Sequence, residues 1–180
     1  MTDPAMSQEP IAESALEPMV IQIHWYSRLM FVAIAALVFA GDQITKALVR
    51  QSIPLHSVVS VIPHFFNLVN TRNPGAAFGL FSDSTSPWRS GFLIAVSVAL
   101  LAVVIGVIWN SRRLQWEAGI ALALIIGGAA SNLTDRIRYG RVTDFLDFHF
   151  RSYHWFTFNL ADSAIVVGAL LLVIHLITNE

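Results

Sequence analysis

The chain has 180 residues, of which 55% are hydrophobic and only 13% are charged. Its mean hydropathy of +0.61 is too apolar for a small soluble domain, whose surface needs more charge, so the composition indicates a membrane protein. The formal net charge is −1 and no basic stripe occurs, so we expect no nucleic-acid partner. Because the chain has no cysteine, disulfides, thiolate nucleophiles and cysteine-ligated zinc are excluded.

The first twenty residues differ from the rest of the chain. They contain four acidic residues, three prolines and no basic residue. A cleaved secretory signal begins with a positively charged region, so this segment is not typical of one. We interpret residues 1–22 as a disordered acidic tail and residues 23–180 as a single membrane domain.

Four segments are long and apolar enough to be transmembrane helices. The clearest runs from Gly91 to Trp109 without a charge, and at about 1.5 Å per residue it spans roughly 28 Å, close to the thickness of the hydrocarbon core. The other three contain polar residues and cover 27–49, 118–137 and 158–177. We therefore predict a mainly α membrane protein with four transmembrane helices, which places both termini on one side of the membrane.

Two of the connections between these helices contain strand patterns. Residues 58–70 hold two β-branched or aromatic runs separated by Pro63, and residues 145–158 alternate apolar with polar side chains. We expect a small extracytoplasmic β-sheet, built from about 51–88 and 145–157 and packed on the helix ends, where its backbone groups are satisfied. Four aromatic residues of the first connection are either a roof over a site or ordinary core and interface residues: Phe65, Phe66, Phe78 and Phe81.

The basic residues give conflicting indications of orientation. Arg112 and Arg113 lie in the short connection between the second and third predicted helices, which suits a cytoplasmic turn. Further arginines lie in or beside the other two connections and favour the opposite orientation: Arg50, Arg72, Arg89, Arg136, Arg138, Arg141 and Arg151. The charge pattern alone leaves the orientation open.

Polar residues gather near one end of the third predicted helix and inside the first. Asn132, Asp135 and Arg136 have the spacing of one helix face. A structural ion pair between Asp135 and Arg136 is the favoured interpretation, since a carboxylate near lipid needs a partner. Asp42 and Lys46 are one helical turn apart and are also predicted to pair.

Three more carboxylates follow in the last third of the chain. Asn159 and Asp162 share the opening turn of the fourth predicted helix, where the helix dipole alone would favour an acid. Asp144 lies at the predicted turn between helix and strand and has no basic residue at helical spacing. The connection must return to the membrane, so it can bring Asp144 close to Asp162. Asp147 alternates outward on the predicted strand and is interpreted as a solvated residue.

Two carboxylates in a partly dry site can hydrolyse a peptide bond together. Within hydrogen-bonding distance they do not both ionise easily, so one stays protonated and the other acts as a base. The base takes a proton from a water as the water attacks a carbonyl, and the protonated acid donates to the carbonyl oxygen. Asp144 and Asp162 are the candidates for such a pair.

Four blocks of the chain resemble, in order and spacing, those of bacterial lipoprotein signal peptidase, also called signal peptidase II. They are DQITK (42–46), NTRNPGAAFGLF (70–81), GGAASNLTDRIRYGRVTDFLDF (127–148) and FNLADSAIVVG (158–168). The resemblance covers roughly residues 27 to 178. Thr143 stands where an apolar residue is more usual, but this departure does not touch the acid pair.

The resemblance implies an aspartyl endopeptidase of the bacterial inner membrane. Such enzymes cut the signal peptide from a prolipoprotein immediately before a diacylglyceryl-modified cysteine, and need no metal or other cofactor. By motif the catalytic pair falls on Asp144 and Asp162, and six residues line or support the site: Asn73, Asn132, Arg136, Asn159, Asp42 and Asp135. The resemblance also implies cytoplasmic termini and a periplasmic active site. We expect a monomer whose partners are prolipoproteins and membrane lipid.

Other functions compete with this interpretation. A serine/lysine protease is disfavoured because Lys46, the only lysine, matches Asp42 by spacing. A small proton-coupled transporter could use Asp42 and Asp162 as relay sites, and a structural assembly factor would need no single acid. A zinc site lacks a His-Glu-x-x-His motif and would take its ligands from four residues: Asp144, Asp147, His149 and His154.

Overall fold

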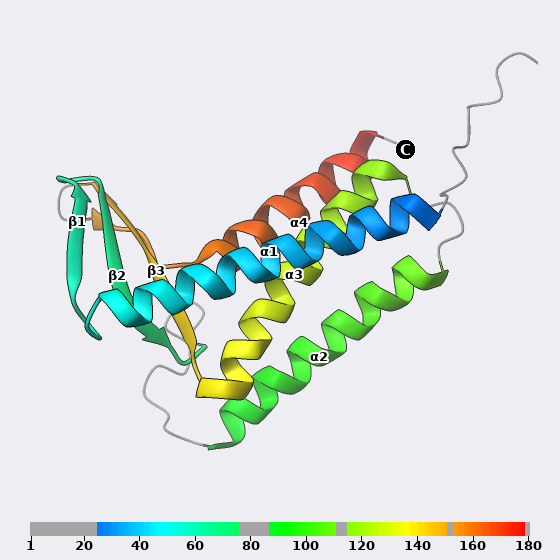
Figure 1. The fold of residues 1–180 in the computed structure, drawn as a ribbon. Helices are drawn as coiled ribbons and strands as arrows, with labels where there is room; N and C mark the ends of the chain where they lie inside the picture. Colours follow the sequence, from blue (N-terminus) through cyan, green and yellow to red (C-terminus); the bar gives the residue numbers. More distant parts are fainter. Residues whose placement is uncertain (1–24, 76–86, 111–114, 151–152, 179–180) are drawn as a thin grey trace, which may run out of the picture.

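The structure is a computed structural model that describes residues 25–75, 87–110, 115–150 and 153–178. In chain order the elements are α1 (Trp25–Ser52), β1 (Val58–Ile62), β2 (Phe66–Asn73), α2 (Pro87–Asn110), α3 (Trp116–Tyr139), β3 (Val142–Phe150), β4 (Tyr153–His154) and α4 (Leu160–Thr178) (Figure 1). All four helices contain a segment long and apolar enough to cross a membrane. The predicted fold class is therefore confirmed, while the acidic tail of residues 1–22 lies outside the described residues and stays a prediction.

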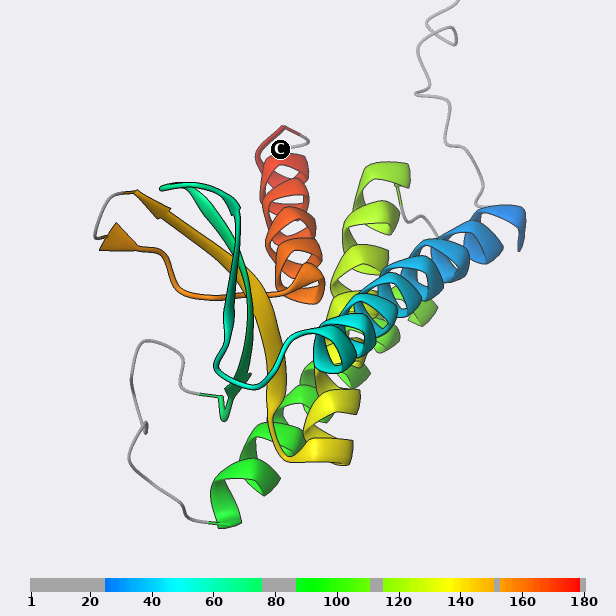
Figure 2. The same cartoon turned by 60° about the vertical axis from the view of Figure 1, so that its left-hand side comes forward.

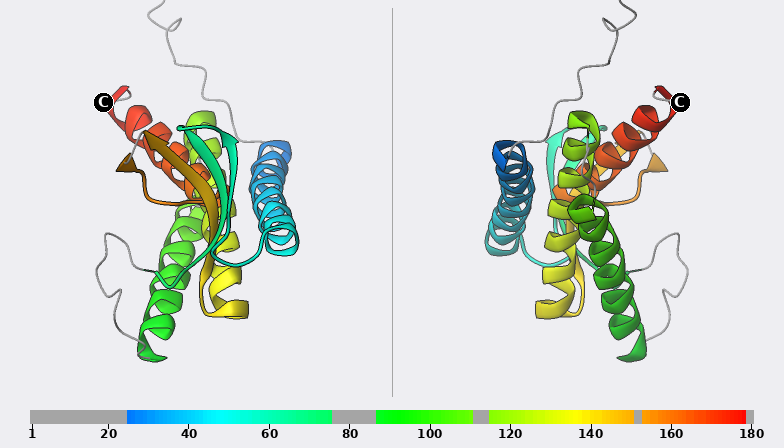
Figure 3. Two further views of the ribbon diagram at one scale, coloured as in Figure 1. Left: turned by 90° about the vertical axis from the view of Figure 1, so that its left-hand side faces the viewer. Right: turned by 90° about the vertical axis from the view of Figure 1, so that its right-hand side faces the viewer.

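Helix α3 is the central helix of the bundle and packs against each of the other three (Figure 3). Two glycines allow the close approach. A Cβ at Gly127 would lie 2.5 Å from the backbone oxygen of Ala35 in α1, and one at Gly128 would lie 2.5 Å from that of Ala161 in α4. Lipid gives no hydrophobic drive for helices to associate, so small residues that let backbones meet hold the bundle together.

Helix α2 has a different role in the bundle. Among the described elements it packs only against α3, and most of its described side chains are exposed while none is buried. Its exposed residues are nearly all apolar, as are those of the long final part of α4. Exposed apolar side chains on helices of this length suit contact with lipid tails rather than water.

The strands form an antiparallel sheet in the order β1-β2-β3-β4, in which β4 contributes only two residues. The sheet stands at one end of the bundle, beside the end of α1 and the start of α4 (Figure 2). The start of α1 and the end of α4 lie at the opposite end (Figure 1). Val49 of α1 and Ile53, the residue after this helix, pack on Phe145 of β3, and this small core fixes the sheet to the helices.

The strand that contains Asp144 begins earlier than predicted. Helix α3 ends at Tyr139, and the next residue, Gly140, adopts a left-handed conformation with φ of 69° and donates from its backbone N–H to the carbonyl of Arg136. A glycine in this conformation ends a helix abruptly. Strand β3 therefore starts at Val142, and the prediction that Asp144 lies in a turn is wrong.

Candidate active site

The opening turn of α4 holds Asp162 in a fixed position. Asn159 precedes the helix, and its Oδ1 accepts a hydrogen bond of 2.9 Å from the backbone N–H of Asp162. In return, Asp162 Oδ2 accepts a hydrogen bond of 3.2 Å from the backbone N–H of Asn159. This reciprocal pair satisfies two N–H groups that the start of a helix leaves free. Asp162 is thus a helix-capping acid as well as a carboxylate held beside the sheet.

Asn159 also connects Asp162 with Asp144. Its Nδ2 donates to Asp144 Oδ1 over 2.7 Å, with a longer contact of 3.4 Å to the backbone oxygen of Thr143. One asparagine therefore binds a carboxylate of β3 and a carboxylate of α4. The connection between α3 and α4 brings the two acids to one site, as expected from its return to the membrane.

Burial changes the acidity of Asp144. Only 1% of the residue is exposed, so water hardly solvates its charged form. Burial is the largest cause that raises the pKa of Asp144 to about 7, and the charge of Asp162 raises it further. The amides of Asn73 and Asn159 and the charge of Lys46 act in the opposite direction. Near neutral pH, Asp144 therefore carries its proton for a large share of the time.

Lys46 is the centre of a buried charged network beside the two acids. Its ammonium lies 2.7 Å from Asp42 Oδ2, which confirms the predicted pair, and 3.5 Å from Asp135 Oδ2. It also donates to Asn132 Oδ1 over 2.8 Å. Since a lysine can only donate, Asn132 turns its oxygen to Lys46 and its Nδ2 to Asp162 Oδ1, at 2.8 Å.

Asp42 joins three helices. Its Oδ2 accepts a hydrogen bond of 2.6 Å from Ser131 Oγ in α3, and its Oδ1 accepts one of 2.9 Å from the backbone N–H of Ala161 in α4. Gln43 adds a bond of 2.9 Å from its Nε2 to Ser131 Oγ. A buried ion pair needs such additional bonds because Coulomb attraction alone rarely offsets the loss of solvation. Asp42 is therefore a structural acid, with both oxygens in use.

Asp135 has different partners from those predicted. The described residues contain no ion pair between Asp135 and the adjacent Arg136, so that prediction is wrong. Asp135 instead lies 3.5 Å from Lys46 and 3.5 Å from Arg50, and it accepts a bond of 3.0 Å from the backbone N–H of Thr143. Successive helical residues point about 100° apart, so neighbours in sequence face different partners. Asp135 consequently fixes the first residues of β3 to α1 and α3.

An acceptor and a donor at this site are buried without a hydrogen-bond partner among the described residues. The acceptor is Asp144 Oδ2 and the donor is Arg136 Nε. The charges of Asp144 and Asp162 both act on Arg136, so the three groups lie near one another. Buried polar atoms in proteins are nearly always paired, and an exception asks for an explanation. These two atoms are available to bind a reacting group.

Asn73 borders the site from the sheet. It is the last residue of β2, and its Oδ1 accepts a hydrogen bond of 2.8 Å from the backbone N–H of Gly75. Its amide lies near enough to Asp144 to lower the pKa of that acid. Gly75 has a positive φ of 91°, which turns the chain away from the strand. All eight residues predicted for the site therefore lie at the sheet end of the bundle.

Asp147 is buried, so its interpretation as a solvated residue is wrong. It is 5% exposed, and its Oδ2 accepts a hydrogen bond of 2.9 Å from Nδ2 of Asn67, its partner in the β2–β3 register. Three positions beyond Asp144 on a strand, it points to the opposite face, together with Phe145. That face packs on α1 and is covered, which alternation alone does not reveal. Among the described residues, no group of three or more His, Asp or Glu side chains is placed to hold a metal.

Aromatic rings cover the sheet near the site. Phe148 stacks on Phe66 with ring centroids 4.7 Å apart and on Phe158 with centroids 5.8 Å apart, and Phe65 meets its edge at 5.5 Å. Phe158, a member of this cluster, directly precedes Asn159, so the cluster borders the site. The remaining aromatics predicted for a roof, at positions 78 and 81, lie outside the described residues.

Three supporting groups on α1 were not assigned to the site from the sequence. Gln43, Lys46 and Arg50 all bind Asp135 or the residues beside it. Their spacing of three and then four positions places them on one face of a helix that is otherwise apolar. A polar stripe within a membrane helix is a signal for a buried polar partner, and it was available in the sequence.

Fold and site together define a membrane protein with four apolar helices and, beside a small sheet, a buried carboxylate paired with a half-buried one. A model of the family described as signal peptidase (SPase) II matches residues 34–178. The chain is 48% identical over 144 residues to the lipoprotein signal peptidase of Solibacter usitatus, covering 80% of this chain and 88% of that protein. It is 41% identical over 147 residues to that of Desulforapulum autotrophicum, covering 82% and 91%.

A solved structure agrees with these relatives. It is described as a bacterial membrane enzyme studied by the in meso method at 1.9 Å resolution, and it matches with a TM-score of 0.73 and 29% identity over 84% of this chain and 94% of that one. The chain belongs to the signal peptidase II family. It is therefore a protease and a multi-pass bacterial membrane protein of lipoprotein processing.

Proposed function

We propose that this protein removes the signal peptide of prolipoproteins by cleaving before a diacylglyceryl-modified cysteine, with Asp144 and Asp162 as the catalytic acids. The observation that carries the proposal is the arrangement of these acids. They share Asn159, both are outside the ion pairs formed by Lys46, and Asp144 has one buried oxygen without a partner among the described residues. The names of the relatives support the substrate class, and the geometry supports the choice of these two acids.

The hydrogen bonds distinguish the roles of the two acids. Both oxygens of Asp162 accept hydrogen bonds, from Asn132 Nδ2 and from the backbone N–H of Asn159, which suits an ionised carboxylate. Asp144 Oδ2 has no hydrogen-bond partner among the described residues, and the pKa of Asp144, about 7, suits a proton donor near neutral pH. In the proposed ground state Asp162 is the base and Asp144 carries the proton.

The reaction then follows general acid–base chemistry. A water attacks the scissile carbonyl carbon and gives one proton to Asp162, while Asp144 donates its proton to the carbonyl oxygen. The tetrahedral intermediate collapses when the carbonyl re-forms and returns its proton to Asp144. The C–N bond breaks as Asp162 passes its proton to the leaving nitrogen. The pair returns to its starting protonation state, and no covalent intermediate is needed.

Arg136 and Asn73 are proposed to hold the substrate. Arg136 Nε is a buried donor without a partner among the described residues, and it can donate to a peptide carbonyl. Asn73 lies at the end of β2, so it can position an extended peptide beside the sheet. Asp42 and Asp135 support the site through Lys46 and the start of β3, and no direct step is assigned to them.

The sheet end is proposed to be periplasmic and both termini cytoplasmic. The start of α1 and the end of α4 lie together at the far end of the bundle (Figure 1). A site at the end of the membrane helices lets acyl chains stay in lipid while the peptide reaches water. The protein is proposed to act as a monomer in the inner membrane and to use no metal or other cofactor.

Cleavage of a diacylglyceryl-modified prolipoprotein by the purified protein in detergent tests the function. One parallel reaction uses the unmodified precursor, and a second uses the Asp144→Asn variant. A third repeats the main reaction with a chelator added. We expect the modified precursor alone to be cut, with or without chelator, and the variant to be inert. Cleavage of both precursors would overturn the lipid requirement. Activity of the variant would overturn the acid pair, and inhibition by chelator that zinc reverses would overturn the metal-free reaction.

A further inference from the structure

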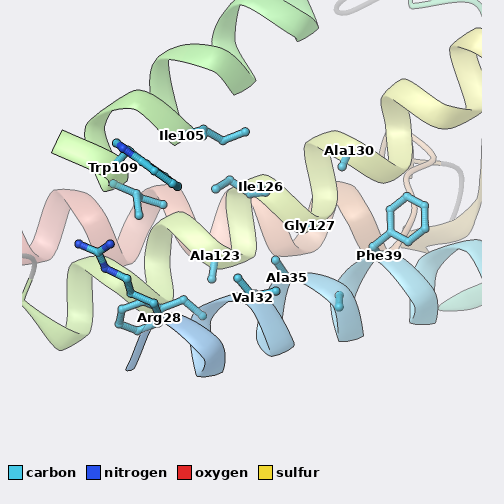
Figure 4. A pocket seen from close by; sticks show the side chains of 13 residues that line it. Arg28, Val32, Ala35, Phe39, Ile105, Trp109, Ala123, Ile126, Gly127 and Ala130 are labelled. Carbon is cyan, nitrogen blue, oxygen red and sulfur yellow. The ribbon is translucent and has the colours of Figure 1, made fainter. Parts of the chain in front are cut away.

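An apolar groove lies at the end of the bundle away from the carboxylates, between α1, α2 and α3 (Figure 4). Its volume is about 510 Å³. The groove exists because α1 and α2 both pack on α3 but do not pack on each other. Small residues of α1 and α3 keep it deep: Ala35, Ala36, Ala123, Gly127 and Ala130. None of these residues belongs to the proposed catalytic site.

The two ends of the groove differ in character. Phe39 and Ala130 lie at one end, and Arg28 and Trp109 lie together at the other (Figure 4). Arg28 is the only charged residue among those that line the groove. The remaining lining is almost entirely apolar, so it offers water few hydrogen-bond partners. The lining thus suits a molecule with a hydrocarbon part and an anionic end.

The length of the groove matches one lipid tail. Arg28 and Phe39 are eleven positions apart on α1, which corresponds to about 16 Å along the helix axis. The hydrocarbon core of a bilayer is about 30 Å thick, so one leaflet accounts for about 15 Å. A hydrocarbon chain that starts beside Arg28 would end near Phe39, at about the middle of the membrane.

The charge at the Arg28 end of the groove favours binding of an anion. Arg28 is exposed and forms no ion pair within the described ranges, not even with Glu117, the acid in the first turn of α3. The first turn of α1 contains no acidic residue, so the positive end of the helix dipole adds to the charge of Arg28. A guanidinium can bind two phosphate oxygens at once, and tryptophan is enriched at the level of lipid headgroups.

We propose that this groove binds one anionic phospholipid, with an acyl chain between α1 and α2 and its phosphate on Arg28. The bound lipid would fill the space that separates α2 from α1 and hold α2 in place on α3. The proposal does not depend on the peptidase reaction, because the groove and the two acids share no residue. The signal segment of a substrate is the competing occupant, and the experiment distinguishes the two.

The test counts lipids that stay bound to the purified full-length protein by native mass spectrometry. Samples in detergent are titrated with phosphatidylglycerol or phosphatidylcholine of identical acyl chains. We expect one phosphatidylglycerol per protein, retained at least about tenfold better than phosphatidylcholine, because the choline ammonium offsets the phosphate charge of phosphatidylcholine and leaves Arg28 less net charge to bind. Arg28→Gln should remove this preference, and Arg28→Lys should keep most of it because the charge remains.

Two matched pairs of variants separate the groove from general lipid contact. Ala36→Phe fills the groove and should abolish retention of both lipids, whereas Ala33→Phe adds the same ring to an exposed site of α1 outside the groove and should not. Arg138→Gln removes an exposed charge at the sheet end and should leave retention unchanged. Unchanged melting temperatures confirm that the variants remain folded.

Four outcomes would overturn the proposal. Equal retention of the two lipids, or retention that Arg28→Gln does not lower, would mean that the groove holds exchanging bulk lipid. Equal effects of Ala36→Phe and Ala33→Phe would place the bound lipid elsewhere. Displacement of the retained lipid by a prolipoprotein signal segment at equal concentration would assign the groove to the substrate. Peptidase assays on the same samples are separate, since loss of cleavage alone would not affect the lipid count.

Discussion

Two pairs of aspartates at the sheet end of the bundle have contrasting surroundings. Asp42 and Asp135 both face Lys46, and every one of their oxygens has a partner. Asp144 and Asp162 form no ion pair with Lys46, and Asp144 Oδ2 has no hydrogen-bond partner among the described residues. We propose that an aspartate of this site is structural where its charge is neutralised and reactive where it is not. The bonding partners of the four acids, rather than their residue type, distinguish the two pairs.

The largest expected effect is on catalysis. Asp144→Asn and Asp162→Asn should each lower kcat by about a thousandfold or more, because each removes a proton transfer from every turnover. Neither change removes a charge from the Lys46 network, so the melting temperature should not fall substantially. Rates on a lipidated precursor and thermal unfolding in detergent check both points. Either variant turning over within about tenfold of the unaltered protein would contradict the division of the acids.

Removal of a structural acid should instead destabilise the protein. Asp42→Asn leaves Lys46 buried with one fewer counter-charge and should lower the free energy of unfolding by about 3 kcal/mol. Denaturation in mixed micelles measures this loss. Glu117→Gln, which neutralises an exposed acid in the first turn of α3, is the control and should change stability by less than about 0.5 kcal/mol. If both variants unfold alike, the network does not hold the helices together.

The contribution of Asp144 to the stability of the folded protein should decrease as the pH rises. Its pKa is raised to about 7 in the folded protein from an ordinary value of 3.8, so the folded state binds the proton more tightly than the unfolded state. The contribution to stability is complete below about pH 3.8, declines as the pH rises to about 7, and is constant above that. Asp144→Asn lacks this decline. Its melting temperature, compared with that of the unaltered protein, should therefore be relatively higher at pH 8 than at pH 4.5.

The same proton should appear in the kinetics. The proposed reaction uses protonated Asp144, so cleavage should fall about tenfold per pH unit well above pH 7. A profile of kcat from pH 5 to pH 9 checks this. Activity that rises steadily to pH 9 would show that Asp144 acts as the base, and the roles of the two acids would be exchanged.

The smallest effect is expected at Asp147. Asp147→Asn changes a buried acid on the face of β3 opposite to Asp144, where it binds Asn67. Loss of one charge-assisted bond should cost about 1–2 kcal/mol of stability and change kcat less than about twofold. Rates on a lipidated precursor and thermal unfolding in detergent check this prediction as well. An inactive but folded Asp147→Asn protein would show that the wrong acid of the strand has been chosen.

Local patterns were sufficient for most of the fold. Long, mainly apolar segments predict the four helices because a segment that spans the lipid must satisfy its backbone groups internally, as a helix does. Pro63 and the alternation around Phe148 predict the strands. The spacing of Asp42 and Lys46 predicts their ion pair because a helix fixes the distance between positions one turn apart. Each of these predictions depends only on residues close together in the chain.

Contacts between distant segments were decided by the packing of the helices and the sheet. Asp135 could have paired with Arg136, but the meeting of α1 and α3 gave it Lys46 and Arg50. Asp147 follows the predicted alternation, yet it is buried and bonded to Asn67, a neighbour that it meets only when β2 pairs with β3. The groove beside Arg28 likewise depends on where α2 rests on α3.

The sequence by itself determined the membrane class, the four helices, the strand segments and the acids that resemble a family motif. The tertiary structure decided which acids are neutralised, which oxygen remains free and where the bundle leaves space. The physical reason is range: periodicity and composition act over one or two helical turns. The free energy of a buried charge or a groove instead depends on groups that are far apart in the chain, such as Gln43 and Asp135 at 92 positions and Asp42 and Ala161 at 119 positions.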